Sequence, residues 1–314
     1  MVGGLTFDLV ILGAGVLTLF AGAELLVKGA GRLALGFGLR AATVGVTVVA
    51  FATTAPELFV AILAAVDVSS EVGFGTVVGS NIANIGLVLG VSALIRPLTI
   101  SRTVMRRHVP FMLFTALLLP VLAINGRIGR LEGVVLLTIL IVFTGYLLYA
   151  VNTDPAPVTA AIREHGDPRP IDFGFVVGGL IALIVGSRWL VSGGSSVLLA
   201  MEVPEFVVGL TVLAIGTSLP ELAASAVGAA RGETGFTIGN VVGSNIYNIV
   251  AVLGILAVAV PVTVSPSTLR FELPLVVVFT LVLVAMMGYG RRLSRLDGAG
   301  LLVGYVVFMW LLFT

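Results

Sequence analysis

The chain has 314 residues, of which 58% are hydrophobic and only 11% are charged, and its formal net charge is +1. A soluble domain carries about 25% charged residues, so this composition excludes an ordinary water-soluble enzyme and a disordered chain. The small net charge gives nucleic-acid binding no electrostatic support. The absence of cysteine excludes disulfides, thiolate metal sites and thiol nucleophiles.

Ten apolar segments follow one another along the chain, as the length allows for spans of about 20 residues. They cover residues 8–27, 41–66, 72–95, 109–124, 131–151, 173–192, 205–230, 235–260, 273–290 and 298–314. We therefore predict an all-α polytopic membrane protein. The leader before the first segment has no basic residue, so we expect a retained span rather than a cleavable signal. The second, seventh and eighth segments are long and contain Gly or Pro, which predicts broken or tilted helices.

Basic residues concentrate in alternate loops. Thirteen Lys and Arg residues fall on one side of the membrane: Lys28, Arg32, Arg40, Arg96, Arg102, Arg106, Arg107, Arg163, Arg169, Arg231, Arg291, Arg292 and Arg295. The other side holds Arg127, Arg130 and Arg270, with Arg188 near the outer end of span six. Cytoplasmic loops carry the excess of Lys and Arg. We therefore expect both termini outside the cell membrane and a cytoplasmic connector at 152–172.

The chain repeats itself with a constant offset of 164 residues. Residues 44–57 (VGVTVVAFATTAPE) and 208–221 (VGLTVLAIGTSLPE) are identical at 8 of 14 positions. Residues 75–90 (GTVVGSNIANIGLVLG) and 239–254 (GNVVGSNIYNIVAVLG) are identical at 12 of 16. Apolar helices do not keep Thr, Pro, Glu, Ser and Asn in register by chance, so this is an internal duplication.

The duplicated unit holds five spans, and an odd number makes the second copy enter the membrane from the opposite side. We predict a first repeat at 1–151, a linker at 152–172 and a second repeat at 173–314, together forming one membrane domain. Inverted repeats with interrupted helices are typical of secondary transporters, whose site lies near the midplane where the copies meet.

Glu57 and Glu221 lie deep in spans two and seven. A carboxylate there costs roughly 2–3 kcal/mol on insertion scales. A lone protonated Glu could serve as a helix–helix hydrogen-bond donor, but two at equivalent positions favour a functional pair. Two facing carboxylates repel unless one is protonated or a cation lies between them. The pair therefore predicts a site for a hard cation.

Each of these glutamates follows a proline, Pro56 or Pro220. Proline lacks an N–H and clashes with the carbonyl four residues back, which predicts helix openings over 50–54 and 214–218. A simple kink is the alternative. Freed carbonyls and the neighbouring hydroxyls of Thr53, Thr54, Thr217 and Ser218 would provide oxygen ligands.

The two GSNIxN motifs add Ser80, Asn81, Asn84, Ser244, Asn245 and Asn248. Amide oxygens suit Na⁺ or Ca²⁺ without adding repulsion between carboxylates. Since all candidate ligands are oxygens, Ca²⁺, Na⁺ or Mg²⁺ is favoured over softer metals. We expect Gly79 and Gly243 to permit close helix packing.

The motifs TTAPE and GTSLPE, each followed by GSNIxN at the same interval, resemble the two alpha-repeats of the cation/Ca²⁺ antiporter superfamily, and most closely its prokaryotic sodium/calcium exchanger family. The resemblance covers essentially the whole chain. It implies ten helices in two inverted halves, with Glu57 and Glu221 as central ligands. It further implies Ca²⁺ ligation by the carbonyls of Thr53 and Thr217, and flanking Na⁺ sites from the Ala50 and Ala214 carbonyls with Thr54 and Ser218. Asn84 and Asn248 would border the middle of the site, and Ser80 and Ser244 would lie near the flanking sites.

Two residues depart from the family pattern, and the second bears on the coupling ion. Ala52 stands where many members have Gly. Asn248 stands where many have Asp, and because Asp there resembles the potassium-dependent branch, Asn248 argues against potassium coupling. The Gly-Asn-x-x-Glu motif of H⁺/Ca²⁺ exchangers is absent, which weakens proton coupling without excluding it.

We therefore expect a membrane transporter, not an enzyme, that exchanges Na⁺ for Ca²⁺ by alternating access. The resemblance implies that spans one and six slide past the rest. The alternatives are an H⁺/Ca²⁺ or other divalent-cation exchanger and, less in keeping with the motifs, a cation channel. The expected partners are the two transported ions and the lipid bilayer. We expect no cofactor, no nucleic acid and no obligate protein partner.

Overall fold

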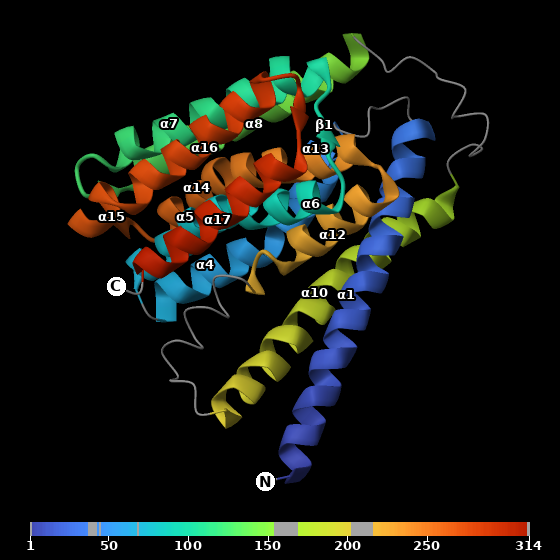
Figure 1. The fold of residues 1–314 in the computed structure, drawn as a ribbon. Helices are drawn as coiled ribbons and strands as arrows, with labels where there is room; N and C mark the ends of the chain where they lie inside the picture. The colour runs from blue at the N-terminus through green and yellow to red at the C-terminus, as the bar shows by residue number, and fades with distance from the viewer. Residues whose placement is uncertain are drawn as a thin grey trace.

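The structure, a computed structural model, describes residues 2–36, 43, 45–67, 69–153, 169–201 and 216–312. Nearly all of these residues are helical, and the helices follow the predicted order (Figure 1). Within the described ranges, nine helices are long and apolar enough to cross a membrane. Of the seventh predicted span, 205–230, only the part from residue 216 onward is described. The prediction of an all-α, multi-pass membrane protein is confirmed.

The first half of the chain forms spans one to five and two short strands. Its elements are α1 (Val2–Gly36), π-helix η1 (Gly45–Val49), α3 (Ala50–Thr53), α4 (Ala55–Asp67), α5 (Ser70–Ala83), π-helix η2 (Asn84–Leu89), α6 (Gly90–Ile95), β1 (Leu98–Thr99), π-helix η3 (Val104–His108), α7 (Val109–Ala123), β2 (Arg127–Ile128) and α8 (Arg130–Thr153). Helix α1 runs well past the predicted end at residue 27.

The second half repeats this plan. Its elements are α10 (Pro170–Ala200), α12 (Leu219–Arg231), α13 (Thr234–Tyr247), π-helix η4 (Asn248–Leu253), α14 (Gly254–Ala259), β3 (Val262–Thr263), α15 (Pro266–Arg270), α16 (Glu272–Gly288), β4 (Arg292–Leu293) and α17 (Arg295–Leu312). The length of the eighth span suggested a broken or tilted helix, but its helix continues without a break in the chain of helical residues. Instead, a π-helical stretch interrupts both it and the third span.

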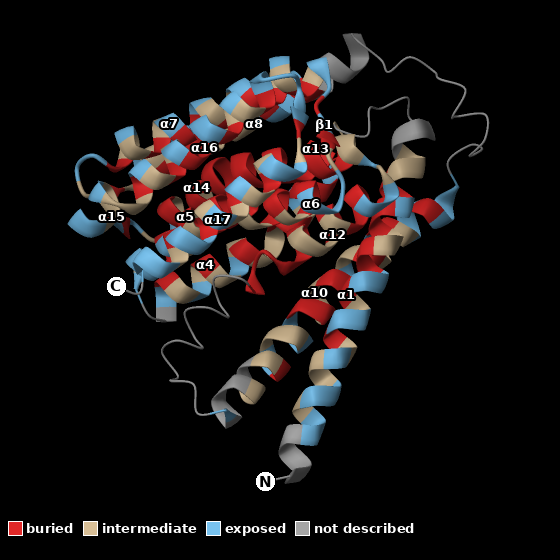
Figure 2. Ribbon diagram, viewed as in Figure 1, coloured by how far each residue is buried: buried red, intermediate tan, exposed pale blue. Residues whose placement is uncertain are grey.

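The third and eighth spans form the centre of the molecule. Most of their residues are buried, whereas α7, α8, α16 and α17 present apolar faces outward (Figure 2). In lipid, such outward apolar side chains need no further cover, since the acyl chains are as apolar as they are. The fold therefore places the two GSNIxN motifs in the interior of the protein, away from lipid.

Two short antiparallel ribbons are related by the symmetry of the two repeats. Strand β1 pairs with β4, and β2 pairs with β3. The repeat offset carries β1 onto β3, so each ribbon joins the two halves. The β1–β4 ribbon brings the basic loops after spans three and nine to one face, which we call the basic face. The β2–β3 ribbon lies at the other end of the helices, the opposite face. The two five-helix repeats are thus inverted.

Helices α1 and α10 cross outside the main helical layers and pack closely on each other (Figure 1). Their contact depends on glycines seven residues apart. The glycines are Gly15, Gly22 and Gly29 in α1 and, related by the repeat offset, Gly179, Gly186 and Gly193 in α10. A Cβ on Gly22 would lie 2.8 Å from the backbone nitrogen of Leu183. The two backbones touch, as is common where membrane helices associate.

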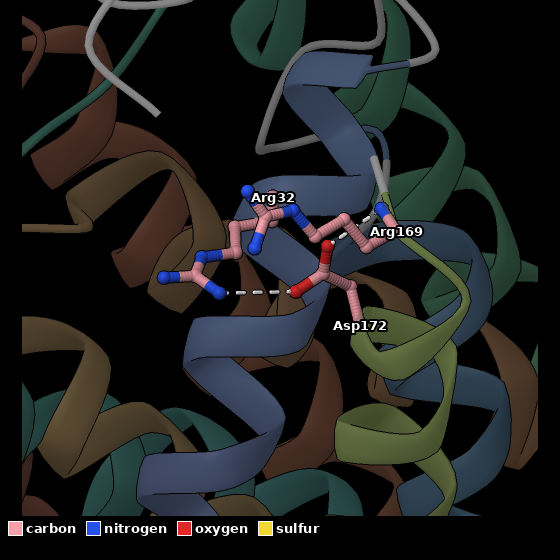
Figure 3. A network of polar contacts seen from close by, with 3 residues as sticks. All are labelled: Arg32, Arg169 and Asp172. Carbon is pink, nitrogen blue, oxygen red and sulfur yellow. Dashed lines mark hydrogen bonds and ion pairs between the residues drawn. The ribbon is translucent and has the colours of Figure 1, made fainter. Parts of the chain in front are cut away.

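An ion pair closes the basic-face end of this helix pair (Figure 3). The Arg32 guanidinium donates to the buried Asp172 carboxylate at 3.2 Å. Asp172, the third residue of α10, also accepts a hydrogen bond from the Arg169 backbone N–H at 2.9 Å. It therefore caps α10 and anchors α1 at the same time.

We predict that Gly22→Ala destabilises the protein by about 1–3 kcal/mol, because the added methyl group forces two backbones apart. Gly13→Ala is the matched control, since a Cβ on Gly13 meets no atom within 4 Å. The measurement is the melting temperature of each purified variant in detergent. Equal melting temperatures for the two variants would contradict the close packing at Gly22.

Candidate ion-binding site

Both glutamates occupy the third position of a helix that starts inside the membrane. Glu57 lies in the first turn of α4 and Glu221 in the first turn of α12, each directly after a proline. Proline fits the start of a helix because the N–H that it lacks would have no intrahelical acceptor there. The positive end of the helix dipole favours a carboxylate in this turn. The Pro-Glu motif thus both starts the helix and places the acid.

The interruptions are narrower than the sequence suggested. In the first repeat only Thr54 leaves the helix, with φ −78° and ψ −8°, and its N–H still donates to the Ala50 carbonyl at 3.0 Å. The expected opening over 50–54 is therefore reduced to one residue, because a small change of ψ is enough to accommodate Pro56. In the second repeat Thr217 and Ser218 form the turn. Ala214, the other predicted carbonyl ligand, lies outside the described residues.

The two carboxyl groups are completely buried and lie next to each other. Glu57 and Glu221 are both 0% exposed, and their side chains are close enough to interact. Among the described residues neither Glu57 oxygen has a hydrogen-bond partner, and Glu221 Oε2 has none either. The remaining oxygen, Glu221 Oε1, accepts from the Ser244 hydroxyl at 3.4 Å. Buried carboxylate oxygens without partners are costly, so this geometry favours either a proton on one carboxyl group or a cation between the two.

Further buried polar atoms around the glutamates also lack partners among the described residues. They are Thr54 Oγ1, Ser218 Oγ, Asn245 Oδ1 and both polar atoms of Asn84 and Asn248. Asn84 and Asn248 begin the π-helices η2 and η4. Such bulges inside α-helices frequently mark functional sites. The symmetry of the motifs is thus kept in the structure.

The other predicted ligands already make hydrogen bonds. The Asn81 and Asn245 amides donate to the carbonyls of Val77 and Val241, four residues back, at 2.8 and 2.9 Å. Ser80 and Thr217 share a hydrogen bond of 3.4 Å between their hydroxyls. Asn81 and Asn245 are therefore held by their own helices, and Asn245 Oδ1 has no partner among the described residues.

The ligand set is made of oxygen atoms and carries two acidic side chains. In the described part of the chain no three His, Cys, Asp or Glu side chains cluster as a metal-binding group. Hydroxyl, amide and carbonyl oxygens would have to complete the coordination of an ion. This combination suits a hard cation such as Ca²⁺ or Na⁺ and not a transition metal. Two ionised carboxylates would match the charge of one Ca²⁺.

Sequence reasoning missed a polar cluster on the basic-face side of the glutamates. The Thr53 hydroxyl donates to Asn240 Oδ1 at 3.4 Å, and Asn240 Nδ2 donates to Ser225 Oγ at 3.0 Å. All three side chains are buried. Comparing the repeats could not find Asn240 and Ser225, because Thr76 and Ala61 occupy the equivalent positions. Polar residues in otherwise apolar spans were the available signal.

The two sides of the site differ in packing. Toward the opposite face, a cavity of about 290 Å³ is lined by Thr76, Ser80 and Thr217. Toward the basic face, the equivalent residues Asn240, Ser244 and Thr53 are buried, and Thr53 and Asn240 are hydrogen-bonded. The cavity also runs past Val72, Thr268 and Leu312 at the ends of their helices. Among the described residues, the site is thus open toward the opposite face and closed toward the basic face.

The paired glycines of the GSNIxN motifs reflect the same difference. A Cβ on Gly243 would lie 2.5 Å from Ala50 Cβ, so the expected close packing is confirmed there. A Cβ on Gly79 would meet no atom of the described residues within 4 Å. The expectation for Gly79 is wrong, because this glycine lines the cavity.

The chain matches the family model described as sodium/calcium exchanger protein twice, over residues 7–149 and 171–314. It is 33% identical over 309 residues to the putative antiporter CaxA of Alkalimonas amylolytica, which covers 96% of this chain and 97% of that protein. It is 32% identical over 308 residues to the inner membrane protein YrbG of Escherichia coli K12, with 95% and 94% covered.

Two further relatives carry an exchanger name. The sodium/calcium exchanger MaX1 of Methanosarcina acetivorans is 29% identical over 348 residues, with 98% of this chain and 99% of that protein covered. The solved structure of the sodium-calcium exchanger NCX_Mj, soaked with 10 mM Na⁺ and without Ca²⁺, superposes with a TM-score of 0.85 at 27% identity. It covers 97% of this chain and 98% of that one.

We predict that Ca²⁺ raises the melting temperature of the purified protein and that Glu57→Gln removes most of this increase. A ligand at roughly 100 times its Kd stabilises a protein by about 2.7 kcal/mol. The matched control is Glu71→Gln, since Glu71 is an exposed carboxylate in the first turn of α5. An undiminished Ca²⁺ effect in Glu57→Gln would place the cation elsewhere.

Proposed function

Because the chain belongs to the sodium/calcium exchanger family, a family of ion transporters and not of enzymes, we propose that it is an antiporter that exchanges Na⁺ for Ca²⁺ across the membrane. The observation that carries this proposal is the pair of buried glutamates with unpartnered oxygen atoms. An antiporter requires one site that binds either ion species. Two carboxylates surrounded by neutral oxygens meet that requirement.

In the proposed mechanism Ca²⁺ occupies the centre, between Glu57 and Glu221. The Thr53 and Thr217 carbonyls complete this central site. Na⁺ ions occupy flanking sites, for which the candidate ligands are the Ala50 and Ala214 carbonyls with Thr54, Ser218, Ser80 and Ser244. Asn84 and Asn248 border the centre, and Asn81 and Asn245 orient the backbone around it.

Exchange follows from competition for the shared carboxylates. If Ca²⁺ and a full set of Na⁺ ions were bound together, they would place excess positive charge in a low-dielectric site, which is electrostatically unfavourable. Binding of Na⁺ therefore expels Ca²⁺, and the reverse holds when Ca²⁺ is abundant. Because both motif asparagines are neutral, Glu57 and Glu221 supply all the negative charge of this ligand set.

Alternating access requires a second conformation, in which the route from the opposite face is closed and the route from the basic face is open. Inverted repeats provide such a pair of conformations, because each half can adopt the arrangement of the other. We further propose that the basic face is cytoplasmic, that both termini are outside and that the protein resides in the cell membrane. The excess of Lys and Arg on the basic face supports this orientation.

The experiment is Ca²⁺ uptake into proteoliposomes loaded with Na⁺, compared with liposomes without a Na⁺ gradient. We expect uptake only with the gradient, and we expect Glu221→Gln to reduce its rate by about tenfold or more, while Glu71→Gln leaves it unchanged. Ca²⁺ uptake driven equally well by a proton gradient would favour an H⁺/Ca²⁺ exchanger. Uptake far faster than carrier turnover and independent of a counter-ion would indicate a channel.

The proposed orientation has a separate test, since the chain contains no cysteine. Glu71→Cys lies on the opposite face and Arg102→Cys on the basic face, and both positions are exposed. In intact cells a membrane-impermeant thiol reagent should label the first variant and not the second. The reverse pattern of labelling would invert the topology.

A further inference from the structure

Four charged residues outside the ion site are related by the repeat offset. Glu24 in α1 corresponds to Arg188 in α10, and Arg231 at the end of α12 corresponds to Asp67 at the end of α4. In each case the sign of the charge is reversed between the copies. An acid–base pair on one face of the molecule therefore has an equivalent base–acid pair on the other face.

The first of these pairs is formed in the structure. Arg231 and Glu24 make an ion pair that ties α1 to the basic-face end of α12. Their side chains are 41% and 29% exposed, so water reaches both. Helix α1 packs along α12 beside this pair, on the side where the route to the glutamates is sealed.

The equivalent place between α10 and α4 is open. Arg188 lines a cavity of about 270 Å³ together with Phe59 and Leu63 of α4. No ion pair involving Arg188 is found with the side chains that the structure describes. Asp67 is the last residue of α4, four residues after Leu63. Arg188 therefore lines a cavity beside the turn of α4 that comes before Asp67.

We propose that these two pairs are alternative latches between the α1–α10 pair and the rest of the protein. Glu24–Arg231 closes the basic face while the opposite face is open. Arg188–Asp67 replaces it when the opposite face closes. The latches rest on the proposed alternating access, because inverted repeats exchange the packing of equivalent interfaces.

The reversed signs have a physical reason. The fixed helices carry Arg231 on the basic face and Asp67 on the opposite face, in keeping with the bias of positive charge, and α1 and α10 carry the complementary charges. The glycine-mediated contact lets α1 and α10 move as one body. Because a partly exposed ion pair contributes little to stability, neither latch holds its state permanently. Breaking one pair while forming the other keeps the two states close in free energy.

Crosslinking tests whether the second contact forms. In the cysteine-free chain, Glu24→Cys/Arg231→Cys and Asp67→Cys/Arg188→Cys should each react with a short bifunctional thiol reagent in membranes. Each crosslink should stop transport. The control, Glu24→Cys/Asp67→Cys, joins opposite faces and should not crosslink. If the 67/188 variant transports ions but does not crosslink under conditions where the 24/231 variant does, the second latch does not exist.

Exchanging the charges of residues 188 and 67 tests whether the second latch depends on electrostatic attraction. Arg188→Glu replaces the basic partner of Asp67 with a second acid, so the second latch cannot form. This variant should exchange ions about threefold more slowly. The double variant Arg188→Glu/Asp67→Arg restores an ion pair and should restore the rate. A double variant as slow as the single one would overturn the proposal, provided that both keep the Ca²⁺-dependent rise in melting temperature. Because crosslinking is read without a Na⁺ gradient, the latches can be tested even if the driving ion is not Na⁺.

Discussion

The structure depends on the burial of two carboxyl groups beside each other within a membrane. Each costs several kcal/mol unless it is compensated, and repulsion between them adds to that cost. The surrounding fold reduces the cost in several ways. Glu57 and Glu221 lie in the first turns of helices, where the backbone dipole favours an anion. Hydroxyl and amide oxygens lie nearby, and the mostly buried third and eighth spans shield the carboxyl groups from lipid. Among the described residues, several buried oxygen atoms of this cluster still lack hydrogen-bond partners, and the proposed cation carrier would use them as ligands.

The duplicated sequence explains the symmetry of the site, and its differences explain the two faces. The GSNIxN and Pro-Glu motifs repeat almost unchanged, so both copies place an acid and an asparagine at the centre. Away from the centre the copies diverge, for example at Asn240 and Thr76. Asn240 joins Thr53 and Ser225 in hydrogen bonds toward the basic face, whereas Thr76 lines a cavity toward the opposite face. The two routes to the shared site therefore differ in their side chains and in their packing.

The α1–α10 pair is the part of the molecule that we propose moves relative to the other helices. Six glycines related by the repeat bring the two backbones into contact, and the buried Asp172 ties them together at one end. Among the described residues, this pair contacts the rest of the protein less extensively, and those contacts include the partly exposed Glu24–Arg231 ion pair. A body that is tightly packed within itself and weakly held to its surroundings can move without unfolding. The central helices, by contrast, hold the asparagines in position.

The sequence by itself determined the all-α class, the order of spans, the inverted duplication and the central residues Glu57 and Glu221. Membrane spans must satisfy their own backbone hydrogen bonds, so apolar length translates directly into helices, and repeated polar residues stand out against an apolar background. The tertiary structure alone decided the narrow break at Thr54, the open surroundings of Gly79 and the cluster around Asn240. These depend on which helices approach one another and on which face is closed, and two glycines in identical motifs can meet different neighbours. An inverted repeat specifies two equivalent arrangements, and only the packing in three dimensions shows which of them the protein has adopted.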